Sequence, residues 1–599
     1  MGDQTINVKD QATAAVDTEE LTRILGEIAE QSQRIVQDFV ARQEQTSGGD
    51  PLNVSEAFVE LTQRLMSNPA HLMQTQFALW QDYIRLWQNT AQKMMGQEVT
   101  PVVRPERSDR RFKDKAWEEN VLFDFIKQSY LLTARWMLNT IGEVEGIDPA
   151  TKRKIDFYAK HYVDAIAPSN FVLTNPEVLK ATIESRGENL LRGLKNMLSD
   201  LESGKGKLNI RMADVEAFEI GRNVATTPGK VVYQNELMQL IQYEPTTEQA
   251  HKRPLLIIPP WINKFYILDL QPKNSFIKYC VEQGFTTFVI SWVNPDKSHA
   301  DKGFEDYMDL GPLAALDAIE QATGERDANV IGYCIGGTML SATLAYMQAT
   351  GDKRFKAVTF LTTLMDFARP GDLGVFIDEE QLKHLESQME KQGYLDGREM
   401  ASTFNMLRAN DLIWSFVVNN YLLGKAPFPF DLLYWNSDST RLPRATHSFY
   451  LRKCYQQNKL IQPGGITLKG VPIDLSTIRV PTYFLSTRED HIAPWTATFS
   501  GFRTVRGTKR MVLAGSGHIA GVINAPAAQK YGYWAEGSKT ARTPEAWLES
   551  ATHHEGSWWP DWAAWNAAKA GPMVPARRPG DGGLAVIEDA PGSYVKVRA

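Results

Sequence analysis

The pattern of apolar and polar positions divides the chain into three parts. The first 50 residues are mostly polar, which predicts a flexible tail. We expect one helix in it, from about residue 18 to 43, which the turn sequence QTSGGDP ends. From residue 51 to about 220, apolar residues recur at spacings of three and four, the period of an amphipathic helix. From about residue 221 to 599, short apolar runs alternate with longer helical stretches. We therefore predict a tail, a helical domain and a larger α/β domain.

The third part contains the material for a parallel sheet. The segment KVVYQNELMQLIQY predicts paired strands, and it is followed by the apolar runs PLLIIPP, FTTFVISW, NVIGY, KAVTFLTT, PTYFLST and KRMVLAG. Between the first five runs the chain is long enough for crossover helices, which indicates parallel strands covered on both faces. The gap from about residue 367 to 480 exceeds one crossover and has its own helical patterning. We expect it to form a cap over the carboxyl edge of the sheet, and we expect a Trp-rich extension from about residue 530.

An aromatic stripe marks one helix of the second part. Phe77, Trp80, Ile84 and Trp87 recur at spacings of three and four and so lie on one helix face. This face either packs on neighbouring helices or is a docking surface for a partner or an apolar particle.

Composition narrows the class of protein. With 43% hydrophobic and 23% charged residues the chain is typical of a globular protein, and its 599 residues predict more than one folded region. A net charge of −6 argues against nucleic acid as the main partner. The three cysteines have no paired spacing and no nearby histidine pattern, so we expect neither a disulfide framework nor a zinc site, and a reducing cytoplasm fits best. We expect no metal and no cofactor.

One uncharged stretch raises the question of a membrane span. No charged residue occurs from Asn329 to Gly351, which is long enough to cross a bilayer. Its glycines, serine and threonines fit a buried strand, a turn and a helix better. We therefore expect no transmembrane segment.

That turn carries the candidate nucleophile. Gly332-Tyr333-Cys334-Ile335-Gly336 has the form of a nucleophile elbow, in which the reactive residue sits on a cramped turn between a strand and a helix. The flanking glycines are needed because a Cβ atom there would collide with neighbouring backbone. The N-terminus of the following helix favours a thiolate at Cys334.

Two backbone amides are candidate oxyanion donors. The Ile335 N–H follows the nucleophile directly, and the second donor of this architecture comes from the loop after an earlier strand, here PPWINKFY. We assign this second donor to Ile262, within a residue or two.

The nucleophile needs a base and an acid that follow it in the chain. Among the histidines downstream of Cys334, His518 lies in the Gly-rich loop LAGSGHIAG directly after the last strong apolar run. The acid is expected after the preceding strand, where PTYFLSTRED ends at Asp490. Asp438 is a rival acid but follows no predicted sheet strand, and His491 is expected to pack rather than to act as the base.

With these residues placed, the chain resembles the class I polyhydroxyalkanoate synthases from about residue 75 to 570. The motifs that carry the resemblance are GYCIGG, PPWINKFYILDLQP, FVISWVNP, YWNSDSTRLP, EDHIAPW, GSGHIAGVINAP and GSWWPDW. The resemblance implies an α/β-hydrolase fold with an inserted cap subdomain, preceded by a helical N-terminal domain. It also implies a catalytic triad of Cys334, Asp490 and His518.

The function that this resemblance implies is an acyltransferase. Such an enzyme polymerises (R)-3-hydroxyacyl-coenzyme A, here 3-hydroxybutyryl-coenzyme A, into a polyester and releases coenzyme A through a cysteine acyl-enzyme. The resemblance further implies a homodimer on cytoplasmic polyester granules, in contact with the growing chain and with phasin-type granule proteins. The alternative that the residues leave open is a thioesterase or hydrolase of the same fold with a cysteine elbow.

Overall fold

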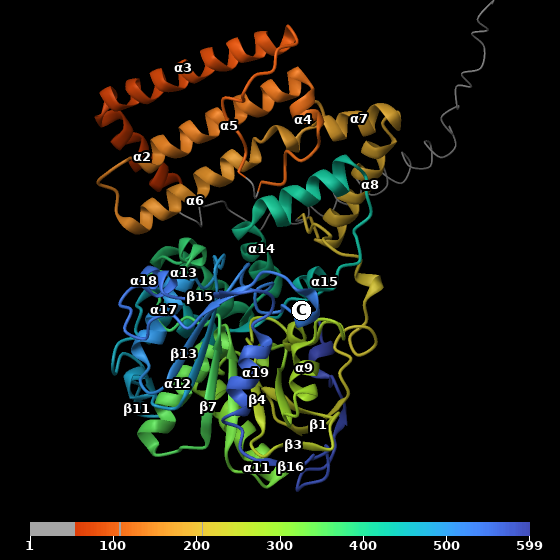
Figure 1. Cartoon of the computed structure of the whole chain (residues 1–599), viewed down its shortest axis with the longest axis vertical. Coiled ribbons are helices and arrows are strands. Elements are labelled where there is room, and N and C mark those ends of the chain that lie inside the picture. The colour runs from red at the N-terminus through yellow and green to blue at the C-terminus, as the bar shows by residue number, and fades with distance from the viewer. Residues whose placement is uncertain (1–53, 107–108, 207) are drawn as a thin grey trace, which may run out of the picture.

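The computed structural model describes residues 54–106, 109–206 and 208–599 (Figure 1). The predicted tail of residues 1–50 lies outside this part, and so does its helix. Within the described part, a group of helices comes first and a large mixed sheet with its own helices follows. This order confirms the predicted fold class. The exact domain boundaries stay predictions.

The large sheet has a parallel centre and antiparallel flanks. Its strands, from one edge to the other, are β15 (Thr552–His554), β14 (Tyr533–Ala535), β13 (Lys509–Ala514), β12 (Thr482–Thr487), β7 (Phe355–Leu361), β6 (Ala328–Tyr333), β4 (Leu255–Ile258), β5 (Thr287–Trp292), β2 (Met238–Tyr243), β1 (Gly229–Gln234) and β17 (Glu588–Asp589). From β13 to β5 all neighbours are parallel. The six predicted apolar runs form these parallel strands, and the predicted strand pair forms the antiparallel pair β1 and β2.

The parallel strands are mostly apolar because both faces of the sheet are covered. Every residue of β4, β5, β6 and β12 is buried. Successive side chains point to opposite faces, so Val330 of β6 joins one apolar core and Ile331 joins the other. The helices that cover these faces are α9 (Phe276–Glu282), α10 (Phe304–Met308), α11 (Ala314–Thr323), α12 (Ile335–Thr350), α17 (Trp495–Thr504), α18 (Pro544–Glu549) and α19 (Trp559–Ala567).

The Trp-rich C-terminal region packs onto one of these faces. The rings of Trp558, Trp559 and Trp562 are buried, with centroids 5.0 to 5.6 Å from that of Phe276 on α9. Large aromatic rings bury much apolar area, so this segment seals the sheet face below it. Short strand pairs outside the main sheet are β3 (Gln249–His251) with β16 (Met573–Pro575), β8 (Tyr394–Leu395) with β9 (Leu442–Pro443), and β10 (Thr467–Leu468) with β11 (Val471–Pro472).

A long insertion joins the neighbouring strands β7 and β12. Its helical segments include α13 (Glu379–Gln392), α14 (Gly397–Leu407), α15 (Asp431–Ser437), α16 (Arg444–Phe449), and the π-helical segments η7 (Asn410–Trp414), η8 (Val417–Leu422) and η9 (Tyr450–Gln456). Buried Tyr450 and Tyr455 of η9 pack in the apolar core that Cys334 also contacts. The insertion is therefore the predicted cap.

The N-terminal helices lie beyond the cap, at the far end of the molecule from the base of the sheet (Figure 1). They are α2 (Val54–Ser67), α3 (Pro69–Met94), α4 (Ala116–Glu119), α5 (Val121–Gly142), α6 (Pro149–Ala165), α7 (Pro176–Glu184) and α8 (Glu188–Ser203). α8 packs closely on η8 of the cap. A Cβ atom at Gly193 would lie 1.7 Å from the carbonyl oxygen of Tyr421, so only glycine allows this approach. The Tyr421 hydroxyl also donates to Asp200 over 2.7 Å.

The aromatic stripe lies on the outer face of α3. Phe77, Trp80 and Trp87 are 58%, 59% and 62% exposed, whereas Leu86 on the opposite face is fully buried. The Phe77 and Trp80 rings stack on each other with centroids 6.0 Å apart. Trp87, at the other end of the stripe, packs against Phe125 of α5 with ring centroids 4.8 Å apart, so the stripe packs on a neighbouring helix in part, while Phe77 and Trp80 stay mostly exposed. An amphipathic period identifies an apolar face but does not say what covers it.

Candidate active site

Cys334 lies at the tip of the turn between β6 and α12. Its backbone has φ 52° and ψ −122°, in a region that residues other than glycine rarely adopt. Its N–H donates to the carbonyl oxygen of Leu361 in the neighbouring strand over 2.9 Å, which holds this strained turn in place. The side chain is half-buried at the N-terminus of α12. Cys334 therefore lies on a strained turn between a strand and a helix, which is the backbone geometry expected of a nucleophile elbow.

Close backbone contacts explain the glycines of the elbow. A Cβ atom at Gly332 would lie 2.5 Å from the Cα of Gly337, and one at Gly336 would lie 2.3 Å from the carbonyl oxygen of Ile258. Gly337, which the motif does not include, is equally constrained, because its Cβ would lie 2.0 Å from Thr363 Oγ1. The elbow thus packs directly against the end of β4.

The loops after β12 and β13 bring Asp490 and His518 together. His518 Nδ1 lies 2.7 Å from Asp490 Oδ2, and Cys334 is near enough to the imidazole for its charge to act on the pKa of His518. Burial alone lowers the pKa of His518, but the charges of Asp490 and Cys334 together hold that pKa well above its ordinary value. The loops after β12 and β13 therefore pair two of the three predicted triad side chains directly, and the third, Cys334, acts on the imidazole through its charge.

Both oxygens of the Asp490 carboxylate are hydrogen-bonded to groups of the protein. Oδ1 accepts hydrogen bonds from the amides of Ile492 and Ala493 over 2.9 and 2.8 Å. Oδ2 accepts from Thr487 Oγ1 over 3.1 Å and faces His518. The side chain has no exposed surface. These contacts orient the carboxylate toward the imidazole.

The rival residues have other partners. Asp438 forms a buried ion pair with Lys264 over 2.7 Å and accepts a hydrogen bond from Tyr266 over 2.9 Å. His491 is half-buried, and burial lowers its pKa to about 4, so it is neutral near pH 7. Cys280 and Cys454 are fully buried, and burial raises the pKa of both thiols. None of these side chains is hydrogen-bonded to His518 in the described structure.

An aromatic shell around the site was not predicted. The Tyr333 ring stacks on His518 with centroids 5.9 Å apart. Tyr450 and Tyr455 of the cap are buried close enough to Cys334 for its charge to raise the pKa of both phenols in addition to the effect of burial. Phe367 closes this group, with its ring 4.8 Å from that of Tyr455. The only sequence signal was the position of Tyr333 inside the elbow motif.

The two candidate oxyanion amides belong to neighbouring turns. The first amides of a helix have no acceptor within it, which leaves the Ile335 N–H at the start of α12 available. Ile262 lies in the turn after β4, half-buried against the same core as Cys334. Neither N–H has a protein acceptor within the described residues.

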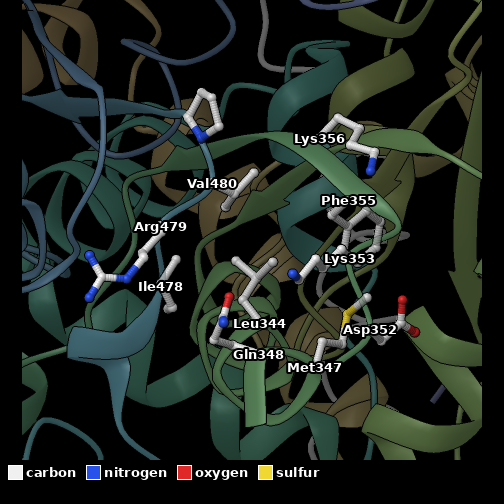
Figure 2. Close-up of a pocket in the computed structure, with 11 residues that line it drawn as sticks. Leu344, Met347, Gln348, Asp352, Lys353, Phe355, Lys356, Ile478, Arg479 and Val480 are labelled. Carbon is white, nitrogen blue, oxygen red and sulfur yellow. The ribbon is translucent and has the colours of Figure 1, made fainter. Parts of the chain in front are cut away.

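The described residues offer no cluster of three or more His, Cys, Asp or Glu side chains that could hold a metal ion. A cavity of about 350 Å³ lies at the other end of α12 and contains none of the predicted site residues (Figure 2). Its lining includes Leu344, Met347 and Phe355, with Lys353 and Arg479 exposed beside them. In the described ranges, no helix is both long and apolar enough to cross a membrane.

Comparison with known proteins agrees with this architecture. Residues 108–280 match the family described as the poly-beta-hydroxybutyrate polymerase (PhaC) N-terminus, and residues 253–525 match the alpha/beta hydrolase fold. The chain is 51% identical over 547 residues to a poly(3-hydroxyalkanoate) polymerase of Methylorubrum extorquens, covering 91% of this chain and 90% of the relative. It is 45% identical over 538 residues to the poly(3-hydroxyalkanoate) polymerase subunit PhaC of Cupriavidus necator, covering 89% of each. The chain therefore belongs to the poly(3-hydroxyalkanoate) polymerase family.

Proposed function

We propose that this polymerase joins (R)-3-hydroxyacyl groups from coenzyme A thioesters, with 3-hydroxybutyryl-coenzyme A as the substrate to test first, through an acyl-enzyme on Cys334. The observation that carries the proposal is the 2.7 Å contact of His518 Nδ1 with Asp490 Oδ2, beside a strained elbow residue Cys334 whose charge raises the pKa of the imidazole. A nucleophile, a base and an orienting acid in this order form a catalytic triad.

In the first step the Cys334 thiolate attacks the thioester carbonyl carbon. The oxyanion that forms accepts hydrogen bonds from the Ile335 and Ile262 amides, and the bond to sulfur of coenzyme A then breaks. His518 gives its proton to the leaving thiolate, so free coenzyme A departs. Exchange of one thioester for another costs little free energy and keeps the acyl group reactive.

In the second step the 3-hydroxyl of an acyl group attacks the enzyme-bound thioester. His518 accepts the hydroxyl proton, an ester bond forms, and the sulfur of Cys334 is released. Asp490 orients the imidazole and stabilises its charged form. This role is supported by the Asp490 carboxylate, whose two oxygens already bind protein groups and which has no exposed surface.

The cap excludes water from the acyl-enzyme. Tyr450 and Tyr455 cover the Cys334 side of the sheet and are buried. Hydrolysis would compete with ester formation and end the chain, so a site without bulk water favours polymerisation. This requirement separates a polymerase from a hydrolase that has the same triad.

The other proposed partners are the polyester product and the surface of the granule that it forms. We infer a homodimer that works in the cytoplasm on polyester granules, with the growing chain and phasin-type proteins as neighbours. The exposed apolar face of α3, with Phe77, Trp80 and Trp87, is the candidate contact surface.

Incubation of the purified protein with 3-hydroxybutyryl-coenzyme A tests the function. We expect thiol release together with an insoluble polyester, and no thiol release from the Cys334→Ala variant. Soluble 3-hydroxybutyrate without any longer ester would instead indicate a thioesterase. Thiol release by the Cys334→Ala variant at the wild-type rate would remove the acyl-enzyme from the mechanism.

A further inference from the structure

The cap holds the loop after β4 through side chains that the proposed triad does not use. The Thr440 hydroxyl donates to the carbonyl oxygen of Trp261 over 3.1 Å, and Trp435 Nε1 donates to that of Lys264 over 2.8 Å. The backbones of Asn263 and Ser439 also form an antiparallel bridge. A short stretch of the cap is thus attached along the whole turn that contains Ile262.

The Thr440 contact acts on one peptide group. The carbonyl oxygen of Trp261 and the N–H of Ile262 belong to the same peptide bond, which is planar and trans. A hydrogen bond that fixes the direction of the carbonyl therefore also fixes the direction of the N–H on the opposite side. Thr440 is 4% exposed, so water does not compete for this bond.

A buried ion pair supports the same attachment. Lys264 Nζ lies 2.7 Å from Asp438 Oδ1, and both side chains are only 3% exposed. The Tyr266 hydroxyl donates to the other carboxylate oxygen of Asp438 over 2.9 Å. Because charges are costly to bury without partners, this arrangement permits few positions of the cap relative to the loop.

The attached loop lies beside the nucleophile. A Cβ atom at Gly336 of the elbow would lie 2.3 and 2.7 Å from the carbonyl oxygens of Ile258 and Pro259, where the loop begins. The Trp261 ring meets that of Tyr450 with centroids 6.4 Å apart. The loop is therefore packed between the elbow and the cap.

We propose that Thr440 is a positioning residue for the oxyanion site, because its hydroxyl holds the peptide between Trp261 and Ile262 with the N–H directed at the substrate carbonyl oxygen. The Lys264–Asp438 pair keeps the cap segment in the place that this contact requires. The inference rests on the proposed acyl-enzyme function. It makes the cap a part of the catalytic machinery as well as a cover.

The test compares two reactions of Cys334. Attack on a thioester develops an oxyanion, whereas alkylation by iodoacetamide needs the thiolate but no oxyanion donors. We expect Thr440→Val to slow the burst of coenzyme A release from 3-hydroxybutyryl-coenzyme A at least about tenfold, since a lost oxyanion donor costs about 10² to 10³. Alkylation of Cys334, followed by peptide mass spectrometry, should stay within about twofold of wild type.

Three matched variants complete the experiment. Thr440→Ser keeps the hydroxyl and should restore the burst, whereas Tyr266→Phe should weaken it because Asp438 loses a partner while the ion pair remains. Thr287→Val removes a buried hydroxyl that donates to a backbone carbonyl at the amino end of β5, and should change neither reaction.

Two results would overturn the positioning role. A wild-type burst in Thr440→Val shows that the hydroxyl does not matter, and an equal loss of burst and alkylation shows that the thiolate or the fold was damaged instead. Failure of the proposed function is seen separately, as the absence of any burst in the wild-type enzyme.

Discussion

His518 Nδ1 lies 2.7 Å from Asp490 Oδ2, and the Asp490 side chain behind it has no exposed surface. The two residues follow neighbouring parallel strands, β13 and β12, so the sheet itself sets their separation. In the proposed mechanism a substrate hydroxyl would therefore meet the imidazole before the carboxylate. Asp490 would then act as a partner of His518 in each step that His518 serves.

Asp490→Asn should therefore slow both steps by a similar factor. The imidazole loses its orienting charge in acylation and in elongation, and we expect a fall of at least about 10²-fold in each rate. The burst of coenzyme A release measures the first step, and growth of the ester in later turnovers measures the second. Glu489→Gln changes an exposed neighbouring carboxylate and should leave both rates unchanged. An intact burst with lost elongation would indicate that Asp490 acts on the hydroxyl directly.

The protonation of His518 should be visible in the stability of the protein. Its pKa is raised in the folded state, so the folded protein binds the proton more tightly than the unfolded chain does. The stabilisation is complete below the ordinary pKa of 6.5 and is lost as pH rises through the folded value. The difference in free energy of unfolding between wild type and His518→Gln should therefore shrink as pH rises. Urea unfolding at a series of pH values measures it.

A second buried histidine provides a control of opposite sign. Burial lowers the pKa of His447 to about 4, so the unfolded chain binds its proton more tightly. Relative to His447→Gln, wild type should lose stability as pH falls from 6.5 toward 4. The same trend with pH in both variants would contradict the assignment of a charged His518.

His518→Ala should also lower the polymerisation rate by at least about 10²-fold, in line with loss of a general base.

Gly336→Ala should destabilise the protein and disturb the elbow. The new methyl group would lie 2.3 Å from the carbonyl oxygen of Ile258, and backbone cannot move aside as a flexible side chain can. We expect a loss of about 1–3 kcal/mol in the free energy of unfolding, together with slower acylation. Gly142→Ala is the matched control, because its Cβ would meet nothing within 4 Å and its φ is not positive. Equal stability of the two variants would contradict the tight packing of the elbow.

The sequence predicted those features that depend on local pattern or chain order. The strands of the parallel sheet are short apolar runs because both faces are buried, and the elbow is visible because its glycines allow no Cβ atom. His518 and Asp490 were found because each directly follows a strand of this sheet, where the fold places them beside Cys334.

The remaining features depend on contacts between distant segments. Tyr450 and Tyr455 belong to a π-helical segment of the cap, and no spacing in the sequence places them in the core beside Cys334. The sequence alone leaves Asp438 as a rival acid. Its ion-pair partner Lys264 lies far away in the chain, so the sequence does not show that this carboxylate is already paired. In both cases the information is in tertiary packing, which periodicity does not contain.

The outer face of α3 leads to the last prediction. Phe77 and Trp80 are more than half exposed and stack on each other, so their removal costs little packing within the chain. The double variant Phe77→Ser, Trp80→Ser should keep the free energy of unfolding within about 0.5 kcal/mol for each substitution. It should bind poly(3-hydroxybutyrate) particles more weakly, measured by cosedimentation, while the burst with soluble thioester stays at the wild-type level. Leu86→Ala, on the buried face of the same helix, should instead lose about 2–5 kcal/mol. Unchanged particle binding by the double variant would exclude this face as the polyester contact, since no other property of the variant should differ.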